Sequence, residues 1–310
     1  MERLRASGHA FNTRGFPALP DEIYLEILSH LPTIPVPTED TIDICNPKSH
    51  PNRQLILSSL SQTCQSLRRV FLRYLWQRIE VYEAMDTQKG PLPTFDVLRK
   101  RPISNYVHSR YAEEVVRQLE IVTIRDPNLA QHVNVLNIVL SYSVETLLPE
   151  LARCISLFPN LHTVQMHFFG PFVTPVPGVA TTFEGYKYPQ IRNVCLSDNC
   201  AGFLASCPRA NRVTPYMHVP CCSHLLPCAK ERCPQIEFFE YLIFSPTTYD
   251  FAMNHFKNLC DVTLYWDLLI SYVDQLRTTL RNRLNLASVL LDFGLLLGQI
   301  FFRLKCLNSA

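Results

Sequence analysis

The side chains best suited to bind a metal ion cluster between residues 218 and 233. The six candidates are His218, Cys221, Cys222, His224, Cys228 and Cys233. Thiolates and imidazoles are the usual ligands of tetrahedral zinc, so four of these side chains could hold one ion. However, the segment lacks a pair of Cys-x-x-Cys knuckles, and adjacent cysteines rarely serve one tight site. We interpret Cys228 and Cys233 as small buried hydrophobic residues and expect no metal site.

Motifs for covalent or phosphate chemistry are missing from the sequence. The chain has nine glycines, no glycine-rich phosphate loop and no Gly-x-Ser-x-Gly nucleophile elbow. Its ten histidines are scattered, and no Cys–His arrangement is indicated. We therefore expect no catalytic residues and no cofactor, and the function must depend on binding.

The composition is that of a protein that buries a large apolar surface. Of 310 residues, 47% are hydrophobic and 18% are charged, whereas soluble domains average about 25% charged residues. This balance favours a permanent partner or a broad buried surface. The net charge of +2 gives no basic face for nucleic acid, so a nucleic-acid partner is not expected.

The cysteines and the N-terminus indicate the compartment. The first residues, Met-Glu-Arg-Leu-Arg-Ala-Ser-Gly-His, contain no apolar run and are not a secretory signal. Without a signal, the twelve cysteines are interpreted as reduced thiols and not as a disulfide framework. The expected localisation is cytoplasmic or nuclear.

Residues 19–31 predict a short amphipathic helix, with the sequence Leu-Pro-Asp-Glu-Ile-Tyr-Leu-Glu-Ile-Leu-Ser-His-Leu. Pro20 suits the first turn, where its missing N–H would have no partner anyway. Asp21 and Glu22 place negative charge at the positive end of the helix dipole. Pro32 ends the helix, and the apolar residues at helical spacing are Ile23, Ile27, Leu28 and Leu31.

Residues 60–76 predict further amphipathic helix, with the sequence Leu-Ser-Gln-Thr-Cys-Gln-Ser-Leu-Arg-Arg-Val-Phe-Leu-Arg-Tyr-Leu-Trp. One side carries apolar residues and the rest carries arginines. A short strand is expected at 78–81. The apolar side consists of Leu67, Val70, Phe71, Tyr74 and Leu75.

These two segments resemble the two halves of an F-box domain of the fungal type, in which a Leu-x-x-x-Cys-x-x-Leu-Arg pattern leads to a Trp. The resemblance implies a helical domain over residues 17–82, preceded by a disordered N-terminus at 1–16. It departs from the common length by a proline-rich loop inserted at 33–53.

An F-box implies binding to a Skp-family adaptor and, through it, to a cullin. Some of the matching residues must instead hold the three helices together, and the sequence does not separate the two roles. Carried over by position, the adaptor-binding candidates are Leu19, Pro20, Ile23, Ile27, Leu28, Leu31, Leu67, Leu75 and Trp76.

The chain from 131 to 310 contains an irregular repeat. Phe158-Pro-Asn-Leu-His-Thr-Val-Gln-Met is echoed by Tyr188-Pro-Gln-Ile-Arg-Asn-Val-Cys-Leu, with weaker copies elsewhere. Each unit predicts a strand, in which Leu161, Val164 and Met166 point inward. The range of spacings is similar to that of leucine-rich repeats. Aligned on the Pro or its equivalent, the units fall at positions 131, 159, 189, 208, 234, 257 and 284.

Amphipathic helices are expected between the strands, at residues 144–157 and 267–283. If units of one strand followed by one helix stack on one another, their strands form a parallel sheet that lines one side of a curved solenoid. An ordinary α/β domain whose strands follow Pro is the alternative, but seven units favour the solenoid. The predicted fold is therefore α/β: a small helical F-box domain followed by an irregular leucine-rich-repeat-like solenoid.

Two further segments need separate interpretation. Residues 83–130 are expected to form a linker and atypical capping units, with a strand at Leu119–Ile124. Leu284–Leu304 is apolar enough to suggest a membrane helix, but Asp292 near its middle would be costly in lipid. We expect a buried strand at 286–291 and no membrane span.

Two functional hypotheses follow. The first is the substrate-recognition subunit of a Skp–cullin–F-box ubiquitin ligase, which binds an unknown protein substrate on the repeat domain and performs no chemistry itself. The alternative is a non-catalytic interaction scaffold that is not engaged with a ubiquitin ligase.

Overall fold

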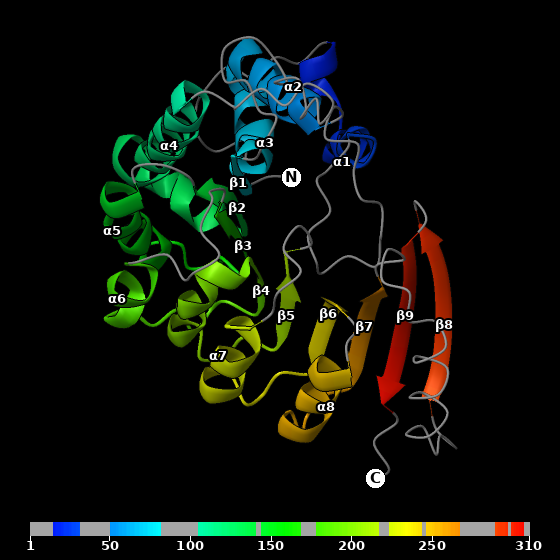
Figure 1. The fold of residues 1–310 in the computed structure, drawn as a ribbon. Helices are drawn as coiled ribbons and strands as arrows, with labels where there is room; N and C mark the ends of the chain where they lie inside the picture. The colour runs from blue at the N-terminus through cyan, green and yellow to red at the C-terminus, as the bar shows by residue number, and fades with distance from the viewer. Residues whose placement is uncertain are drawn as a thin grey trace.

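The computed structural model describes residues 15–31, 50–81, 105–140, 144–168, 178–216, 223–243, 246–266, 289–296 and 299–306. They form a group of N-terminal helices and one nine-stranded sheet (Figure 1). The metal-ligand candidates His218, Cys221 and Cys222 and the predicted helix at 267–283 lie outside these ranges.

The N-terminal helices, hereafter the helical module, comprise residues 15–31 and 50–75. A short 3-10 turn, η2 (Phe16–Ala18), precedes α1 (Asp21–Ser29), α2 (His50–Thr63) and α3 (Gln65–Leu75). The helix predicted within 19–31 is confirmed. The loop predicted at 33–53 is too long, because α2 already begins at His50. Pro51 does not prevent this start, since a first-turn residue needs no N–H partner.

The core of the helical module is small. Its buried side chains are Tyr24, Leu28, Leu57, Leu67 and Phe71. The Tyr24 ring meets Phe16 and Phe71 edge-on at 5.5 and 5.4 Å between ring centroids, and its hydroxyl donates to the Phe16 carbonyl at 2.7 Å. The apolar side predicted for the second segment is confirmed, since Leu67 and Phe71 are buried while Arg68, Arg69 and Arg73 are exposed.

Seven parallel strands follow one another across the sheet in chain order. Because each strand pairs with the next, the chain advances in one direction, and the connecting helices lie on the outer side of an arc of strands (Figure 1). The α/β class with a parallel sheet is thus confirmed. The strands are β1 (Arg78–Val81), β2 (Val135–Leu140), β3 (Thr163–Phe168), β4 (Asn193–Leu196), β5 (Arg212–Pro215), β6 (Phe238–Ile243) and β7 (Asp261–Trp266).

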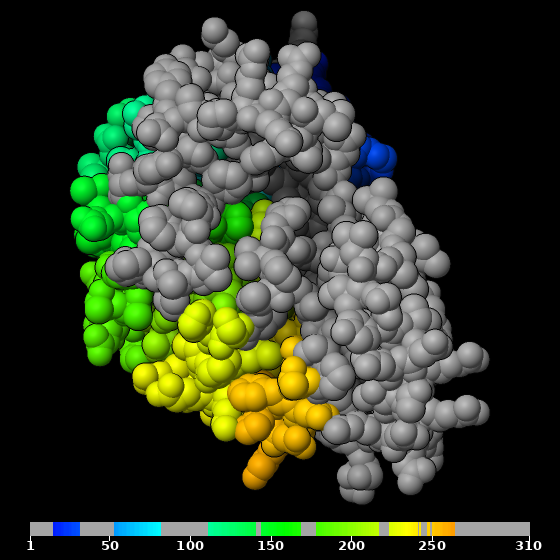
Figure 2. All heavy atoms as spheres, in the orientation of Figure 1, coloured from blue at the N-terminus to red at the C-terminus, as the bar shows by residue number. Residues whose placement is uncertain are grey.

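The connecting helical segments form the outer layer, which is the coloured rim of Figure 2. Its helix α5 confirms the helix predicted at 144–157, and Leu147, Leu151 and Ile155 are buried as expected. The segments are α4 (Asn105–Glu120), α5 (Val144–Ser156), α6 (Val179–Glu184), the 3-10 helix η5 (Asp198–Ser206), α7 (Leu225–Arg232) and α8 (Pro246–His255).

The strand predicted at Leu119–Ile124 is wrong. Helix α4 continues to Glu120 and passes into a π-helical turn, η3 (Ile121–Arg125), and then a 3-10 helix, η4 (Pro127–His132). Tyr111, Val115, Leu119 and Val122 form one buried stripe at helical spacing. The six-residue window was too short to show this period.

The repeat detected in the sequence corresponds to a hydrogen-bonding pattern that recurs from one unit to the next. Strands β2 to β7 each begin four residues after a repeat position, so position 159 precedes Thr163 and position 189 precedes Asn193. One residue before each strand, the backbone bonds to the preceding unit: His162 N donates to Asn134 O at 3.1 Å and Arg192 N to His162 O at 2.9 Å. The same contact recurs at the later units.

Side-chain amides reinforce this register at the Pro-Asn and Pro-Gln pairs. Asn160 Nδ2 donates to the Gln131 carbonyl at 2.6 Å. Gln190 Nε2 donates to the Phe158 carbonyl, and Gln235 Nε2 to the Pro208 carbonyl. Each amide satisfies a turn carbonyl of the unit before it, which explains why Asn or Gln follows the repeat proline.

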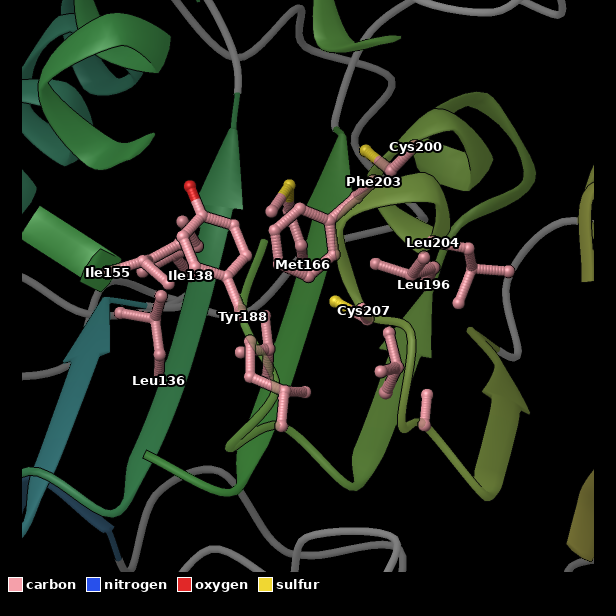
Figure 3. Packing of buried hydrophobic residues seen from close by; sticks show 14 of the residues in the cluster. Leu136, Ile138, Ile155, Met166, Tyr188, Leu196, Cys200, Phe203, Leu204 and Cys207 are labelled. Atoms are coloured by element: carbon pink, nitrogen blue, oxygen red, sulfur yellow. The ribbon is translucent and has the colours of Figure 1, made fainter. Parts of the chain in front are cut away.

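One large core lies between the sheet and its outer layer. In Figure 3, Ile138, Met166 and Leu196 from the strands face Tyr188 and Phe203 from the connecting segments. Leu161, Val164 and Met166 are fully buried, as predicted. The residue before each repeat proline, or before its equivalent, is buried too. These residues, the buried column, are Phe158, Tyr188, Cys207, Cys233 and Phe256.

The helical module leads directly into this sheet. Strand β1, expected as the end of the helical domain, pairs in parallel with β2 and is the first strand of the sheet. Trp76 is buried in the large core, and Leu75 packs against both cores. The sheet therefore begins at Arg78 and not after residue 130.

The C-terminal strands run differently from the predicted repeat. Strands β8 (Val289–Leu296) and β9 (Gln299–Cys306) form an antiparallel pair, and β9 rather than β8 lies beside β7. A strand does form near 286–291, but it does not continue the parallel series. Among the described residues, no helix has the length and apolar character needed to cross a membrane.

Candidate protein-docking surface

The helical module exposes an unusual share of large apolar side chains. In the described part of the chain, nine such side chains are exposed, and five of them belong to this small module. Isolated exposed apolar residues are ordinary, whereas a concentration of them on one small unit indicates a protein contact. These five, the exposed apolar set, are Phe16, Ile23, Leu25, Leu55 and Ile56.

The structure separates the predicted adaptor-binding residues into two groups. Pro20 and Ile23 are exposed, and Leu19, Ile27 and Leu31 are half-buried. Ile23 and Ile27 are one turn apart on the same side of α1, so both can contribute to one contact. Figure 2 shows atoms of α1, in blue, at the surface of the molecule.

The remaining candidates are part of the interior. Leu28 and Leu67 belong to the core of the helical module, and Trp76 belongs to the core of the sheet region. Leu75 is half-buried between the two cores. These four side chains hold the chain together and position the exposed ones.

Sequence reasoning missed Phe16, Leu25, Leu55 and Ile56. On α2 the buried stripe is Arg53, Leu57 and Ser61, a mixed set that gives no clear apolar period. The signal available was the run Leu55-Ile56-Leu57, because three consecutive residues of a helix cannot all face one core. Only Leu57 faces inward.

Neither a protein-family model nor a curated protein matches this chain.

The face of the sheet that points away from the helices carries many polar residues. Side chains alternate along a strand, and the rows that include Leu136, Val164 and Val213 face the helices. The opposite rows run in register across the sheet. Their polar residues, all buried or half-buried, are Arg78, Glu80, Asn137, Thr163, Gln165, Asn193, Arg212, Thr214 and Asp261. Glu240 lies in the irregular part of β6 and contacts Arg212 and Thr214.

Two charged groups on this face pair tightly. Arg212 donates to Glu240, and Thr214 Oγ1 donates to the second oxygen of that carboxylate at 3.2 Å. The Arg212 guanidinium also lies 4.5 Å from the centre of the Phe238 ring. Burial raises the pKa of Glu240, opposed by the Arg212 charge. The carboxylate is thus already satisfied by side chains of its own chain.

The cysteines of the former zinc hypothesis pack as predicted where the structure describes them. Cys233 is buried, and its thiol lies 3.5 Å from the Cys207 carbonyl, while the half-buried Cys228 donates to the Ala201 carbonyl at 3.2 Å. Within the described ranges, no three His, Cys, Asp or Glu side chains gather as metal ligands would. Burial raises the pKa of Cys233 to about 12, which disfavours the thiolate needed for metal binding or nucleophilic attack.

Proposed function

We propose that this chain is the substrate-recognition subunit of a Skp–cullin–F-box ubiquitin ligase, acting in the cytosol or nucleus without catalysing a reaction itself. The helical module would dock the Skp-family adaptor, and the sheet region would hold a protein substrate. The observation that carries the proposal is the exposed apolar set, of which Ile23 and Leu25 lie on the helix that follows the Leu19-Pro20 pair of the F-box-like sequence.

The burial of these side chains supports the proposal energetically. Burying an exposed Ile, Leu or Phe side chain contributes roughly 1.5–3 kcal/mol. Four or five such contacts would contribute roughly 6–15 kcal/mol, the same order as the cost of association and side-chain ordering, which is about 4–15 kcal/mol.

We further propose that the sheet region is a leucine-rich-repeat-like solenoid. The constant four-residue offset between repeat position and strand supports this, as does the backbone contact repeated from unit to unit. In such arrays each unit packs mainly on its neighbours, and the sheet face is a common binding surface. We expect a protein substrate to bind the sheet region, but not through the polar rows of that face, whose side chains are buried or half-buried.

A matched pair of substitutions tests the docking surface. Ile23 on α1 and Leu157 beyond α5 are each 44% exposed, so Asp at either site disturbs folding to a similar, small extent. We expect Ile23→Asp to weaken capture of a purified Skp-family adaptor at least tenfold and Leu157→Asp to leave it unchanged. Failure of the unmodified chain to bind any Skp-family adaptor would sink the proposal.

The alternative, an interaction scaffold outside any ligase, shares the same docking surface. The two are separated by cullin recruitment. A complex of chain, adaptor and cullin in one gel-filtration peak supports the ligase, whereas an adaptor complex that excludes cullin supports the scaffold. Capture of partners by a chain lacking residues 15–75 would then identify substrates held by the sheet region.

A further inference from the structure

The charges of the helical module are segregated by helix. All the charged residues of α1 are acidic, and all those of α3 are basic. These residues, every one of them exposed, are Asp21, Glu22 and Glu26 on α1 and Arg68, Arg69 and Arg73 on α3. Neither helix can therefore form an ion pair between its own charged residues.

The helices of the outer layer follow the opposite pattern and neutralise their own charges. On α4, Arg117 pairs with Glu114 at 2.6 Å, and on α5, Arg153 pairs with Glu150. Opposite charges three or four residues apart stabilise a helix, whereas like charges at that spacing destabilise it. The single-sign helices of the module thus forgo a stabilising arrangement that the rest of the chain uses.

The segregation places like charges one helical turn apart. Glu22 and Glu26, hereafter the acidic face, are four residues apart on α1, and Arg69 and Arg73, hereafter the basic face, have the same spacing on α3. Glu26 also bonds His30, the exposed residue after α1, at 3.1 Å. Because the two spacings are equal, two carboxylates of one molecule can meet two guanidinium groups of another.

The two faces point away from the contact between their helices. The Tyr24 ring of α1 meets the Phe71 ring of α3 at 5.4 Å between ring centroids. The acidic face consists of the residues two before and two after Tyr24, and the basic face has the same relation to Phe71. Two residues turn a helix by about 200°, so each face lies on the far side of its helix. One copy therefore cannot close its acidic face on its own basic face.

We propose that copies of this chain associate head to tail, with the acidic face of one copy against the basic face of the next. Guanidinium and carboxylate groups form paired, charge-assisted hydrogen bonds. Ile23 and Leu25 flank the acidic face on its two sides, 44% and 50% exposed, and would add apolar burial to the contact. Because the two faces differ, each pair of copies keeps one free face of each kind, and association continues beyond a dimer.

This self-association does not rest on the ligase proposal, although both use α1. Ile23 belongs to the exposed apolar set, so a second copy and a Skp-family adaptor would compete for this helix. The two proposals can therefore fail separately, since the association is measured on the chain alone.

Sedimentation velocity of the full-length chain tests the association. At an ionic strength of about 0.01 M, where charges act over about 30 Å, we expect the weight-average mass to rise with protein concentration. At about 1 M, where they act over about 3 Å, the association constant should fall at least tenfold. A mass that does not depend on concentration at the lower ionic strength would overturn the proposal.

Two neutralised variants test whether the two faces bind each other. One carries Glu22→Gln and Glu26→Gln, and the other carries Arg69→Gln and Arg73→Gln. Each variant alone should self-associate at least tenfold more weakly than the unmodified chain, because it retains only one charged face. An equimolar mixture should form a complex of one copy of each variant and nothing larger, since only one complementary pair of faces remains.

A matched control removes two exposed carboxylates outside the module, Glu113→Gln on α4 with Glu184→Gln on α6. It changes the net charge as much as the variant of the acidic face does, and its association constant should stay within twofold of the unmodified value. An equal loss in the control, or a mixture of the two variants that forms no complex, would contradict specific pairing. A monomeric chain whose capture of a Skp-family adaptor weakens on neutralising either face would assign the faces to the adaptor and also overturn the proposal.

Discussion

In the helical module, five buried side chains form the core and five large apolar side chains are exposed, whereas in the sheet region one core extends without interruption from Trp76 to Val262. A unit with so small a core gains little stability from its own packing. The module is instead anchored by Leu75 and Trp76 to the sheet. Within the described residues, its exposed apolar side chains are therefore available for a partner, whereas most apolar side chains of the sheet region are buried in the fold.

The largest difference between the two regions is expected at alkaline pH. Burial raises the pKa of Cys154 to about 11 and that of Cys200 and Cys233 to about 12. It raises the pKa of Cys195 and Cys207 as well. All five thiols belong to the sheet region, and in the unfolded chain each has a pKa of about 8.5.

Because the folded state disfavours these thiolates, their stabilising effect is complete below about pH 8.5 and is lost as the pH rises toward the folded values. Each thiol contributes a slope of about 1.4 kcal/mol per pH unit. We expect the free energy of unfolding, measured with urea, to fall by about 2 kcal/mol for each fully shielded thiol between pH 8.5 and 10.5. Cys200→Ala should make the dependence of the unfolding free energy on pH less steep by the contribution of one thiol. A free energy of unfolding that does not change with pH over this range would contradict the expectation.

The second largest effect compares two phenylalanines that are both fully buried. Phe203 meets Phe183 edge-on at 4.8 Å and stacks on Tyr188 at 5.9 Å between ring centroids. Phe203→Ala should lower the free energy of unfolding by about 3–5 kcal/mol. Phe71→Ala, in the helical module, should open that module while the sheet stays protected.

Hydrogen exchange followed by mass spectrometry measures both variants segment by segment. We expect Phe203→Ala to accelerate exchange mainly in β2 to β5 and Phe71→Ala mainly in α1 to α3. If each variant accelerated exchange equally in every segment, the two cores would form one cooperative unit and the contrast between the regions would be lost.

The third effect concerns a helix start that is stabilised from another segment. Asp198 accepts hydrogen bonds from the backbone N–H groups of His224 and Leu225, at 2.9 and 2.8 Å, and from Ser223 Oγ at 2.9 Å. Asp198→Ala should cost about 2–3 kcal/mol, because it leaves the buried Leu225 N–H and two partly buried donors without an acceptor. Asp198→Asn should cost less, and the exposed Glu184→Ala should cost under about 0.5 kcal/mol. Equal effects of Asp198→Ala and Glu184→Ala on the urea midpoint would refute this role.

These regions also differ in how well the sequence predicted them. In the sheet region, the Pro-Asn and Pro-Gln pairs predicted which segments form strands, because the same amide and backbone contacts recur at each unit. The predicted start, the residue after each pair, was two residues early, since β3 begins at Thr163 and not at Leu161. The direction of β8 and β9 was not predictable in this way, since an apolar strand pattern carries no information on its partner. The segment Leu119–Ile124 was misassigned because its helical period is visible only when Tyr111 and Val115 are included.

In the helical module, α1 was predicted, but the break at Cys64 between α2 and α3 and the roles of the side chains were not. Ile23 and Leu28 have the same hydrophobicity and both fit the helical spacing, yet only Leu28 meets Tyr24 and Phe71 in the core. That distinction depends on how α1 packs against α3, which sequence spacing does not specify. Arg53 was assigned to a loop, so its burial was not foreseen.

The smallest effect compares two glutamines. Gln190 Nε2 donates to the carbonyls of Ile155 and Phe158 at 3.4 and 3.3 Å, and so ties one repeat unit to the previous one. Gln62, in the helical module, is exposed and donates only to Ser58 Oγ at 3.2 Å, among the described contacts. Gln190→Ala should cost about 1 kcal/mol and Gln62→Ala under about 0.5 kcal/mol in urea unfolding. If the two variants lost the same stability, the amide contacts would be incidental to the repeat, and its constant register would have to come from the backbone ladder and the buried column alone.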